Sequence, residues 1–217
     1  MTEPAAMFTA MASRPTIITD IDNVLAFFVE AAVTALNVHF GTSLTAGEVH
    51  VWPMGKMLMP ALSVWLEEQL RRGVFYSNLA PDFTAISAIN TLHGQGYRVL
   101  ATSDRPQAVA EPTRRWLEQW GVEVDEVLLY GPGSKQRVIR DEGFDARNPA
   151  ILIDDDPAKA LLARPGVAVW SPLRPWSLPG DVPIHDYWIF PSWDAALDRL
   201  STMETSHVQE VCGTNFH

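Results

Sequence analysis

Two aspartates follow the first apolar segment of the chain, within the stretch TIITDIDNVLAFF at residues 16–28. Asp20 and Asp22 stand where a buried strand would end and a second apolar run begins. Removing a carboxylate from water is costly unless a cation or a hydrogen-bond donor compensates its charge. The pair therefore either lies at an exposed sheet edge without a role or is held in place for chemistry.

Polar residues also end or follow three later apolar segments, YRVLATS, EVLLY and AILIDDD. They are Thr102, Ser103, Asp104 and Arg105 at the first, Lys135 after the second, and Asp154, Asp155 and Asp156 at the third. In an open parallel sheet the carboxyl ends of the strands lie at one edge, where ligands bind. Each signal is weak alone, but their recurrence at four successive strand ends favours a functional site.

These segments alternate with helical patterns, and the alternation predicts the fold class. With GVAVW at 166–170 they make five short apolar runs without strict alternation, which is typical of parallel strands covered on both faces. Helical patterns at 82–93, 107–120, 134–142 and 157–163 end at glycine or before proline. We therefore expect an α/β protein with a Rossmann-like open parallel sheet of five strands and right-handed crossovers.

One connection is much longer than a crossover usually needs. It joins the first strand to YRVLATS and contains two helical patterns, at 23–40 and 60–73. An insertion at this point would lie over the carboxyl edge of the sheet, next to Asp20 and Asp22. The expected limits are 15–26 and 80–200 for a core domain, 27–79 for a small helical cap, and 1–14 and 203–217 for flexible ends.

Clustered carboxylates with hydroxyl and ammonium groups beside them are suited to phosphoryl transfer. Carboxylates repel one another unless a hard cation neutralises them, and a site built from oxygen ligands favours Mg²⁺. One carboxylate can attack phosphorus and form an aspartyl-phosphate, while a second, two residues later, can protonate the leaving alcohol. The hydroxyl and ammonium groups can hold the phosphate oxygens, whose charge must be balanced in the transition state.

The motifs and their order resemble those of the haloacid dehalogenase superfamily of phosphohydrolases. TDIDNVLA resembles its first motif, LATS its second, Lys135 its third and LIDDD its fourth. The sequence is most similar to the 5'(3')-deoxyribonucleotidases, which open with aspartate–x–aspartate–glycine–valine–leucine–alanine–x–phenylalanine. VW followed by VFYSNLAP, then ATSDRP, EPTRRWLEQWG and PSWDAAL, continue the match, which covers residues 16–200.

The resemblance implies a HAD-like fold and a role for each aspartate. Asp20 would be the nucleophile and a Mg²⁺ ligand. Asp22 would be the general acid and base and would lend its backbone carbonyl to the metal. Asp154 and Asp155 would complete the metal site, directly or through water. Asn23 departs from the family pattern, because the family has glycine after the second aspartate.

The resemblance also implies a substrate-binding set. Thr102, Ser103 and Lys135 would bind phosphate, and Lys135 would also orient the nucleophile. Arg105 follows them and has no counterpart in the nearest family members, so its role as a substrate contact is an expectation from position. Aromatic residues of the cap would stack on the substrate base or, alternatively, pack the small core of the cap itself; they are Phe28 and Trp65.

Composition limits the possible partners. A formal net charge of −10 argues against binding to a nucleic acid polymer, and one cysteine, Cys212, excludes a disulfide framework or a thiolate metal cluster. No segment approaches the roughly 18 apolar residues of a membrane span, and the N-terminus is a poor signal peptide. We therefore predict a cytoplasmic protein that acts on a small phosphate ester. A homodimer is compatible with the sequence.

The expected function is Mg²⁺-dependent removal of phosphate from ribo- or deoxyribonucleoside monophosphates, by a 5'-nucleotidase. A phosphatase for another small phosphate ester is the first alternative. A receiver-like phosphoacceptor uses a similar residue set, but its acceptor aspartate comes after the acidic pair and it has no long insertion. A non-catalytic nucleotide-binding protein would not need the complete set. LRPWSLPGDVP at 173–183 is interpreted as a connector that could rim the site.

Overall fold

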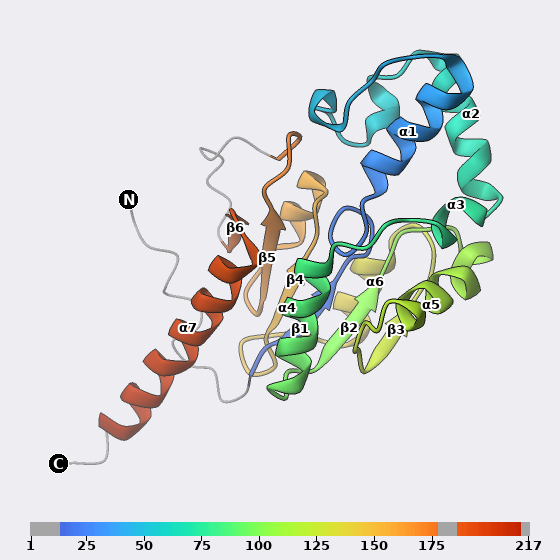
Figure 1. Ribbon diagram of the computed structural model, residues 1–217. Helices are drawn as coiled ribbons and strands as arrows, with labels where there is room; N and C mark the ends of the chain where they lie inside the picture. Colours follow the sequence, from blue (N-terminus) through green and yellow to red (C-terminus); the bar gives the residue numbers. More distant parts are fainter. Residues whose placement is uncertain (1–13, 178–185, 214–217) are drawn as a thin grey trace.

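The computed structural model describes residues 14–177 and 186–213, and six parallel strands form one open sheet in it. They are β1 (Thr16–Thr19), β2 (Val99–Thr102), β3 (Glu126–Leu128), β4 (Ala150–Ile153), β5 (Val167–Pro172) and β6 (Tyr187–Phe190). Their order in the sheet is β3-β2-β1-β4-β5-β6 (Figure 1). β1 and β4 therefore pair in the middle of the sheet, so the aspartates that follow them are neighbours.

The open parallel sheet is confirmed, but the expected number of five strands is wrong. The sixth strand, β6, is the segment YWIF, which follows the proline-rich stretch after β5 and ends just before Pro191. Four residues between proline-containing segments carry little pattern of their own. Parallel pairing with β5, in which Tyr187 faces Val169 and Trp188 faces Trp170, defines this strand.

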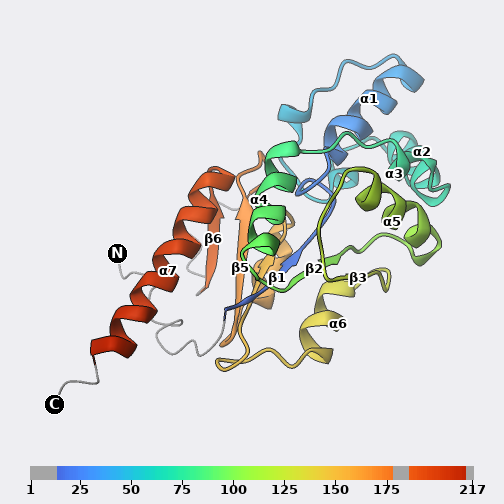
Figure 2. The same cartoon turned by 60° about the horizontal axis from the view of Figure 1, so that its bottom comes forward.

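Helices cover both faces of the sheet. Side chains of β1 alternate between the faces, so Ile17 joins the apolar cluster under α4, α5 and α7, whereas Ile18 joins a second cluster under α6. Figure 1 shows α4 and α7 side by side on the same side of the sheet, and Figure 2 shows α6 apart from them. The covering helices are α4 (Phe83–Gly94), α5 (Ala110–Gln119), α6 (Ser134–Asp141) and α7 (Trp193–Gly213).

Two segments differ from the expected helices. The segment after β4 is a short 3₁₀ helix, η5 (Pro157–Leu162), that ends before Pro165, and not an α-helix. The last helix, α7, continues to Gly213 and so enters the segment 203–217 that was expected to be a flexible end. None of the helices in the described part of the chain is long and apolar enough to cross a lipid bilayer.

The long connection after β1 forms the expected helical insertion. It contains α1 (Phe28–Phe40), α2 (Pro60–Arg71) and α3 (Val74–Ser77), joined by the 3₁₀ turns η2 (Ala46–Glu48) and η3 (Met54–Lys56). α1 begins at Phe28 and not near Asn23, because residues 21–26 form a tight turn closed by Asn23 N–H donating to the Ala26 carbonyl at 2.8 Å. The insertion, hereafter the cap, stands at one end of the sheet (Figure 1).

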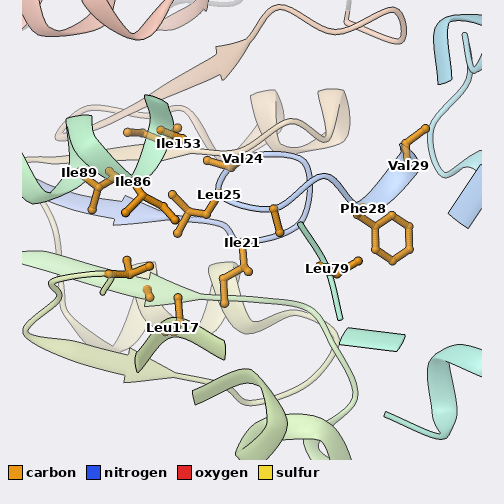
Figure 3. Close-up of a cluster of buried hydrophobic side chains, with 14 of the residues drawn as sticks. Ile21, Val24, Leu25, Phe28, Val29, Leu79, Ile86, Ile89, Leu117 and Ile153 are labelled. Carbon is orange, nitrogen blue, oxygen red and sulfur yellow. The ribbon is translucent and has the colours of Figure 1, made fainter. Parts of the chain in front are cut away.

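The main hydrophobic core extends from the sheet into the base of the cap. Figure 3 shows Ile21, Val24 and Leu25 of the turn after β1 gathered with side chains of α4, while Phe28 lies farther out, near Leu79. Apolar side chains of the core therefore pack against the turn that carries Asp20 and Asp22. Fixed backbone at this point is what a precise arrangement of carboxylates requires.

Candidate active site

Three carboxylates meet at the carboxyl end of the two central strands. Asp20 follows β1, and Asp154 and Asp155 follow β4; all three are buried. One oxygen atom from each lies within 4.8 Å of the other two. Strand pairing produces this arrangement, because Thr19 is in register with Ile153 and the Asp20 amide donates to the Ile153 carbonyl at 2.8 Å.

Lys135 places a cation against the same group. It lies in the first turn of α6 and is only 2% exposed. Its Nζ atom is 3.0 Å from Asp20 Oδ1, 3.4 Å from Asp154 Oδ2 and 3.7 Å from Asp104 Oδ2. The predicted proximity of Lys135 to Asp20 is therefore present in the structure.

The buried charges shift one another's protonation. Burial raises the pKa of the Asp20 carboxyl to about 8, although Lys135 opposes this effect. Burial also raises the pKa of Asp154 and, more strongly, that of Asp155. For Lys135, burial alone would lower the pKa, but the carboxylates of Asp154, Asp20 and Asp104 raise it, so the ammonium stays charged. One lysine does not compensate three buried carboxylates.

The donor set fits a hard divalent cation. Among the described residues, Asp20 Oδ1 and Asp154 Oδ2 are buried oxygens without a hydrogen bond of good geometry. Buried carboxylate oxygens that share a single ammonium, that of Lys135, are incompletely compensated, and all the available ligand atoms here are carboxylate oxygens. Mg²⁺ is the cation that such a compact oxygen site suits.

The side chain of Asp22 is not part of this group, because Arg105 binds it. Arg105 donates from Nε and Nη2 to the two Asp22 carboxylate oxygens, at 2.9 and 2.6 Å, and from Nη1 to Thr113 Oγ1 at 3.0 Å. Its guanidinium carbon also lies 4.3 Å from the centre of the Tyr76 ring. Arg105 was expected to contact substrate; it lines the pocket, but its donors are engaged by Asp22 and Thr113.

The two expected phosphate-binding hydroxyls are placed differently. Thr102 is fully buried, donates to the Leu128 carbonyl at 2.9 Å and does not line the pocket. Ser103 does line the pocket, and its Oγ accepts a hydrogen bond from the Arg105 amide at 3.2 Å. Successive residues at a strand end point in opposite directions, which explains why only Ser103 faces the site.

The charged groups form one side of a cavity of about 160 Å³, and aromatic rings of the cap form the other. Phe28, Trp52 and Tyr76 supply these rings. Phe28 therefore lines the site as expected, but it also packs against Phe75, with ring centres 5.5 Å apart, and is largely buried. Trp52 was not predicted as a site residue, although it lies in the VW pair that carries part of the resemblance.

Trp65, the other aromatic residue expected to stack on a substrate, lies elsewhere. Its ring stacks on His39 with centres 4.4 Å apart. It lines a separate hollow of about 690 Å³ between α1, α2 and α3, which shares no lining residue with the cavity at the sheet edge. The structure thus places Trp65 in the alternative setting, within the cap, because the face of α2 that carries it is turned toward α1.

A second lysine, which the sequence motifs did not indicate, lies at the site. Lys159 Nζ is 2.8 Å from Asp104 Oδ2 and 3.4 Å from Asp156 Oδ2. Asp104 in turn accepts from the backbone amides of Gly133 and Ser134 at the start of α6, so it fixes the turn that presents Lys135. The available signal was the position of Lys159 three residues after Asp156, at the start of a helical segment.

The segment after β5 also reaches the site, and is more than a connector. Trp176 Nε1 donates to Asp155 Oδ2 at 3.0 Å, and Arg174 Nε donates to the Asn23 carbonyl at 3.0 Å. Asn23 has φ 57°, the left-handed conformation that glycine would adopt easily, and its amide Nδ2 donates to the same Asp155 oxygen at 3.0 Å. Residues 178–183 lie outside the described part of the chain.

Comparison with known proteins identifies the fold. No family model and no curated protein sequence matches the chain. A predicted phosphatase from Clostridium acetobutylicum superposes with a TM-score of 0.61 at 8% identity, over 89% of this chain and all of that one. An L-2-haloacid dehalogenase gives 0.54 at 13% identity, over 88% of this chain and all of that one.

A HAD-family hydrolase from Deinococcus radiodurans R1, solved with phosphate and sodium, gives a TM-score of 0.55 at 15% identity over 88% of this chain and 97% of that one. At such identities the likeness concerns the fold alone. The chain therefore has the HAD-like α/β fold with a helical insertion after the first strand, as the motifs predicted. The closer resemblance to nucleotidases stays a prediction.

Proposed function

We propose that this protein, which has the HAD-like fold, is a Mg²⁺-dependent phosphohydrolase that acts on a small phosphate monoester. The observation that carries the proposal is the group of three buried carboxylates, Asp20, Asp154 and Asp155, with Lys135 3.0 Å from Asp20. Such a group is unfavourable in an apolar interior without a cation. A cation beside a carboxylate nucleophile is what attack on an anionic phosphate needs.

Asp20 is the proposed nucleophile. Its carboxylate attacks phosphorus and forms an aspartyl-phosphate while the substrate alcohol leaves. Mg²⁺ held by Asp20, Asp154 and Asp155 would neutralise the carboxylates and screen the approach of the phosphate. Lys135 and the hydroxyl of Ser103 hold the non-bridging phosphate oxygens, whose charge must be balanced in a loose transition state.

Asp22 is the proposed general acid and base. It would protonate the leaving alcohol in the first step and remove a proton from the attacking water in the second. Both of its oxygens accept hydrogen bonds from Arg105, so the leaving oxygen or the water must displace part of this contact. The backbone carbonyl of Asp22 stays a proposed contact to the metal.

A nucleoside monophosphate is the proposed substrate. Phe28, Trp52 and Tyr76 place aromatic rings across the cavity from the charged sheet edge, and a base can stack on such rings for about 1–3 kcal/mol. The cavity of about 160 Å³ is smaller than the roughly 300–1,000 Å³ typical of ligand pockets. A nucleotide would therefore enter only if the cap moves away from the sheet edge.

The site favours a small ester over the receiver-like alternative. A phosphoacceptor must be reached by a phosphate donor on another protein, but Asp20 is 5% exposed and the cap rings stand over it. A sugar phosphate or another small ester is the alternative substrate. Its hydrolysis would use the same steps, and only the part of the substrate that meets the cap would differ.

Hydrolysis by the purified protein tests the proposal. Phosphate release from nucleoside monophosphates and sugar phosphates should depend on Mg²⁺, stop in a chelator and return when Mg²⁺ is added in excess. Nucleoside monophosphates should be the best substrates. Hydrolysis that persists in chelator would contradict the metal site, and a preference for sugar phosphates would contradict the nucleotidase assignment but not the phosphatase.

A further inference from the structure

Trp176 touches both the expected metal site and the cap. Its indole Nε1 donates to Asp155 Oδ2 at 3.0 Å, and its ring is stacked on Trp52 of the cap, with centres 5.4 Å apart and planes 23° apart. Trp176 is 6% exposed, so both contacts are shielded from water. No other described residue combines a hydrogen bond to one of the three carboxylates with a ring contact to the cap.

The hydrogen bond fixes the orientation of a carboxylate. Two donors, Trp176 Nε1 and Asn23 Nδ2, converge on the same oxygen of Asp155, each at 3.0 Å. A carboxylate held at one oxygen cannot rotate freely. Hydrogen bonds of this kind, from residues that do not touch the metal, orient ligands and often change metal affinity by 10–100-fold.

The stacking contact gives the cap a share in that orientation. Trp52 lies between the 3₁₀ turns η2 and η3 of the cap, and its ring also packs edge-on against Phe28, with centres 6.2 Å apart. Aromatic pairs of this geometry contribute beyond the area that they bury. If the cap moves away from the sheet edge, Trp176 loses the ring that holds it against Asp155.

We propose that Trp176 is a positioning residue that couples the cap to the metal ligand Asp155, so that Mg²⁺ binds more tightly when the cap lies against the core. The inference rests on the proposed function only through the identity of the metal. Coupling of this kind is reciprocal, so bound Mg²⁺ also favours the position of the cap in which Trp52 meets Trp176. Metal binding and enclosure of the substrate then support each other.

Mg²⁺ titration calorimetry on the full-length protein, at one pH and without substrate, tests the coupling. Trp176→Phe keeps an aromatic ring but removes the N–H donor, and should weaken Mg²⁺ binding about tenfold or more. Trp52→Ala removes the cap ring that stacks on Trp176, keeps the Trp176 N–H donor, and should weaken Mg²⁺ binding several-fold. Trp116→Phe is the matched control, because it removes another buried indole hydrogen bond, to the Leu79 carbonyl at 2.8 Å, and should leave Mg²⁺ affinity unchanged.

The outcomes separate this proposal from the function. Wild-type affinity in Trp176→Phe would overturn the role of the indole, and wild-type affinity in Trp52→Ala would overturn the link to the cap. Absence of Mg²⁺ binding by the wild type would overturn the proposed function as well. Thermal unfolding in chelator checks that each variant is folded. If Trp176→Phe does not fold, the Mg²⁺ affinity of Trp52→Ala still tests the coupling, because Trp52 is only half-buried.

Discussion

The two sides of the proposed active-site cavity carry different kinds of side chain. The sheet edge contributes buried charges, Asp20, Asp154, Asp155 and Lys135, at positions set by paired strands and the start of a helix. The cap contributes the aromatic rings of Phe28, Trp52 and Tyr76. A reaction that needs atoms placed to fractions of an ångström belongs on the side built from paired strands, and recognition of the rest of the substrate can lie on the side of the rings.

Two side chains of the core, Arg105 and Trp176, join these sides. Arg105 of the core binds Asp22 and lies over the Tyr76 ring of the cap, and Trp176 of the core binds Asp155 and stacks on Trp52. Two aspartates of the sheet edge, Asp22 and Asp155, are therefore each bound by a core side chain that also contacts a cap ring. The difference between the sides predicts that changes at the sheet edge abolish the reaction, whereas changes in the cap alter which substrates react.

The largest expected effect is that of Asp20→Asn at the sheet edge. The substitution keeps the shape of the side chain but removes the attacking charge, so turnover should fall to background. It also removes a buried carboxylate whose pKa is raised to about 8, so the fold should persist. Steady-state phosphate release measures the first effect and thermal unfolding the second; a variant that kept more than a few per cent of activity would rule out Asp20 as nucleophile.

A smaller and more selective effect is expected from Trp52→Ala in the cap. At saturating Mg²⁺, loss of one stacking ring should raise KM for a nucleoside monophosphate by about tenfold or somewhat more. It should hardly change kcat/KM for a small phosphate ester without a base. Trp65→Ala is the control. Because Trp65 lines the separate hollow, this variant should keep the wild-type KM and kcat/KM for both substrates.

Equal losses on both substrates in Trp52→Ala would mean that the ring supports the site and does not recognise a base. Phe28→Ala should affect more than substrate binding, because Phe28 packs against Phe75 and Trp52 as well as lining the cavity. We expect it to lower stability and to raise KM together.

The last expected effect is a pH dependence of stability that comes from the sheet edge. Burial raises the pKa of Asp20 from 3.8 to about 8, so between these values the folded protein holds a proton that the unfolded chain has lost. Stability in chelator should therefore fall as pH rises from 5 toward 8. Asp154 and Asp155 are shifted in the same direction and add to the slope.

Thermal unfolding of the wild type and Asp20→Asn in chelator measures this slope, which should be shallower in the variant. Added Mg²⁺ should raise the Tm of the wild type more at pH 8 than at pH 6, because ionised carboxylates bind the cation. A wild-type Tm that does not change over this range would contradict the buried, uncompensated carboxylates. Carboxyls with lowered pKa values, such as Asp104, titrate below this window and do not interfere.

The sequence alone located the charged half of the site. Asp20, Asp154 and Asp155 lie directly after strands, and Lys135 lies at the start of a helix, so their positions follow from local structure and from the rule that parallel strands end at one edge. The same reasoning predicted the helical insertion and the parallel sheet. It could not show that Thr102 faces the sheet and Ser103 the cavity, because one residue of register exchanges the two.

Only the tertiary structure decided what surrounds these charges. Trp52 and Trp176 come from the cap and from the segment after β5, and they meet because the cap folds back over the sheet edge. The sequence left two settings open for Trp65, because the pattern of a helix shows which residues share a face but not which neighbour that face meets. Which residues directly follow a strand is a local property that the sequence determines, whereas a contact between distant segments depends on how the whole chain packs.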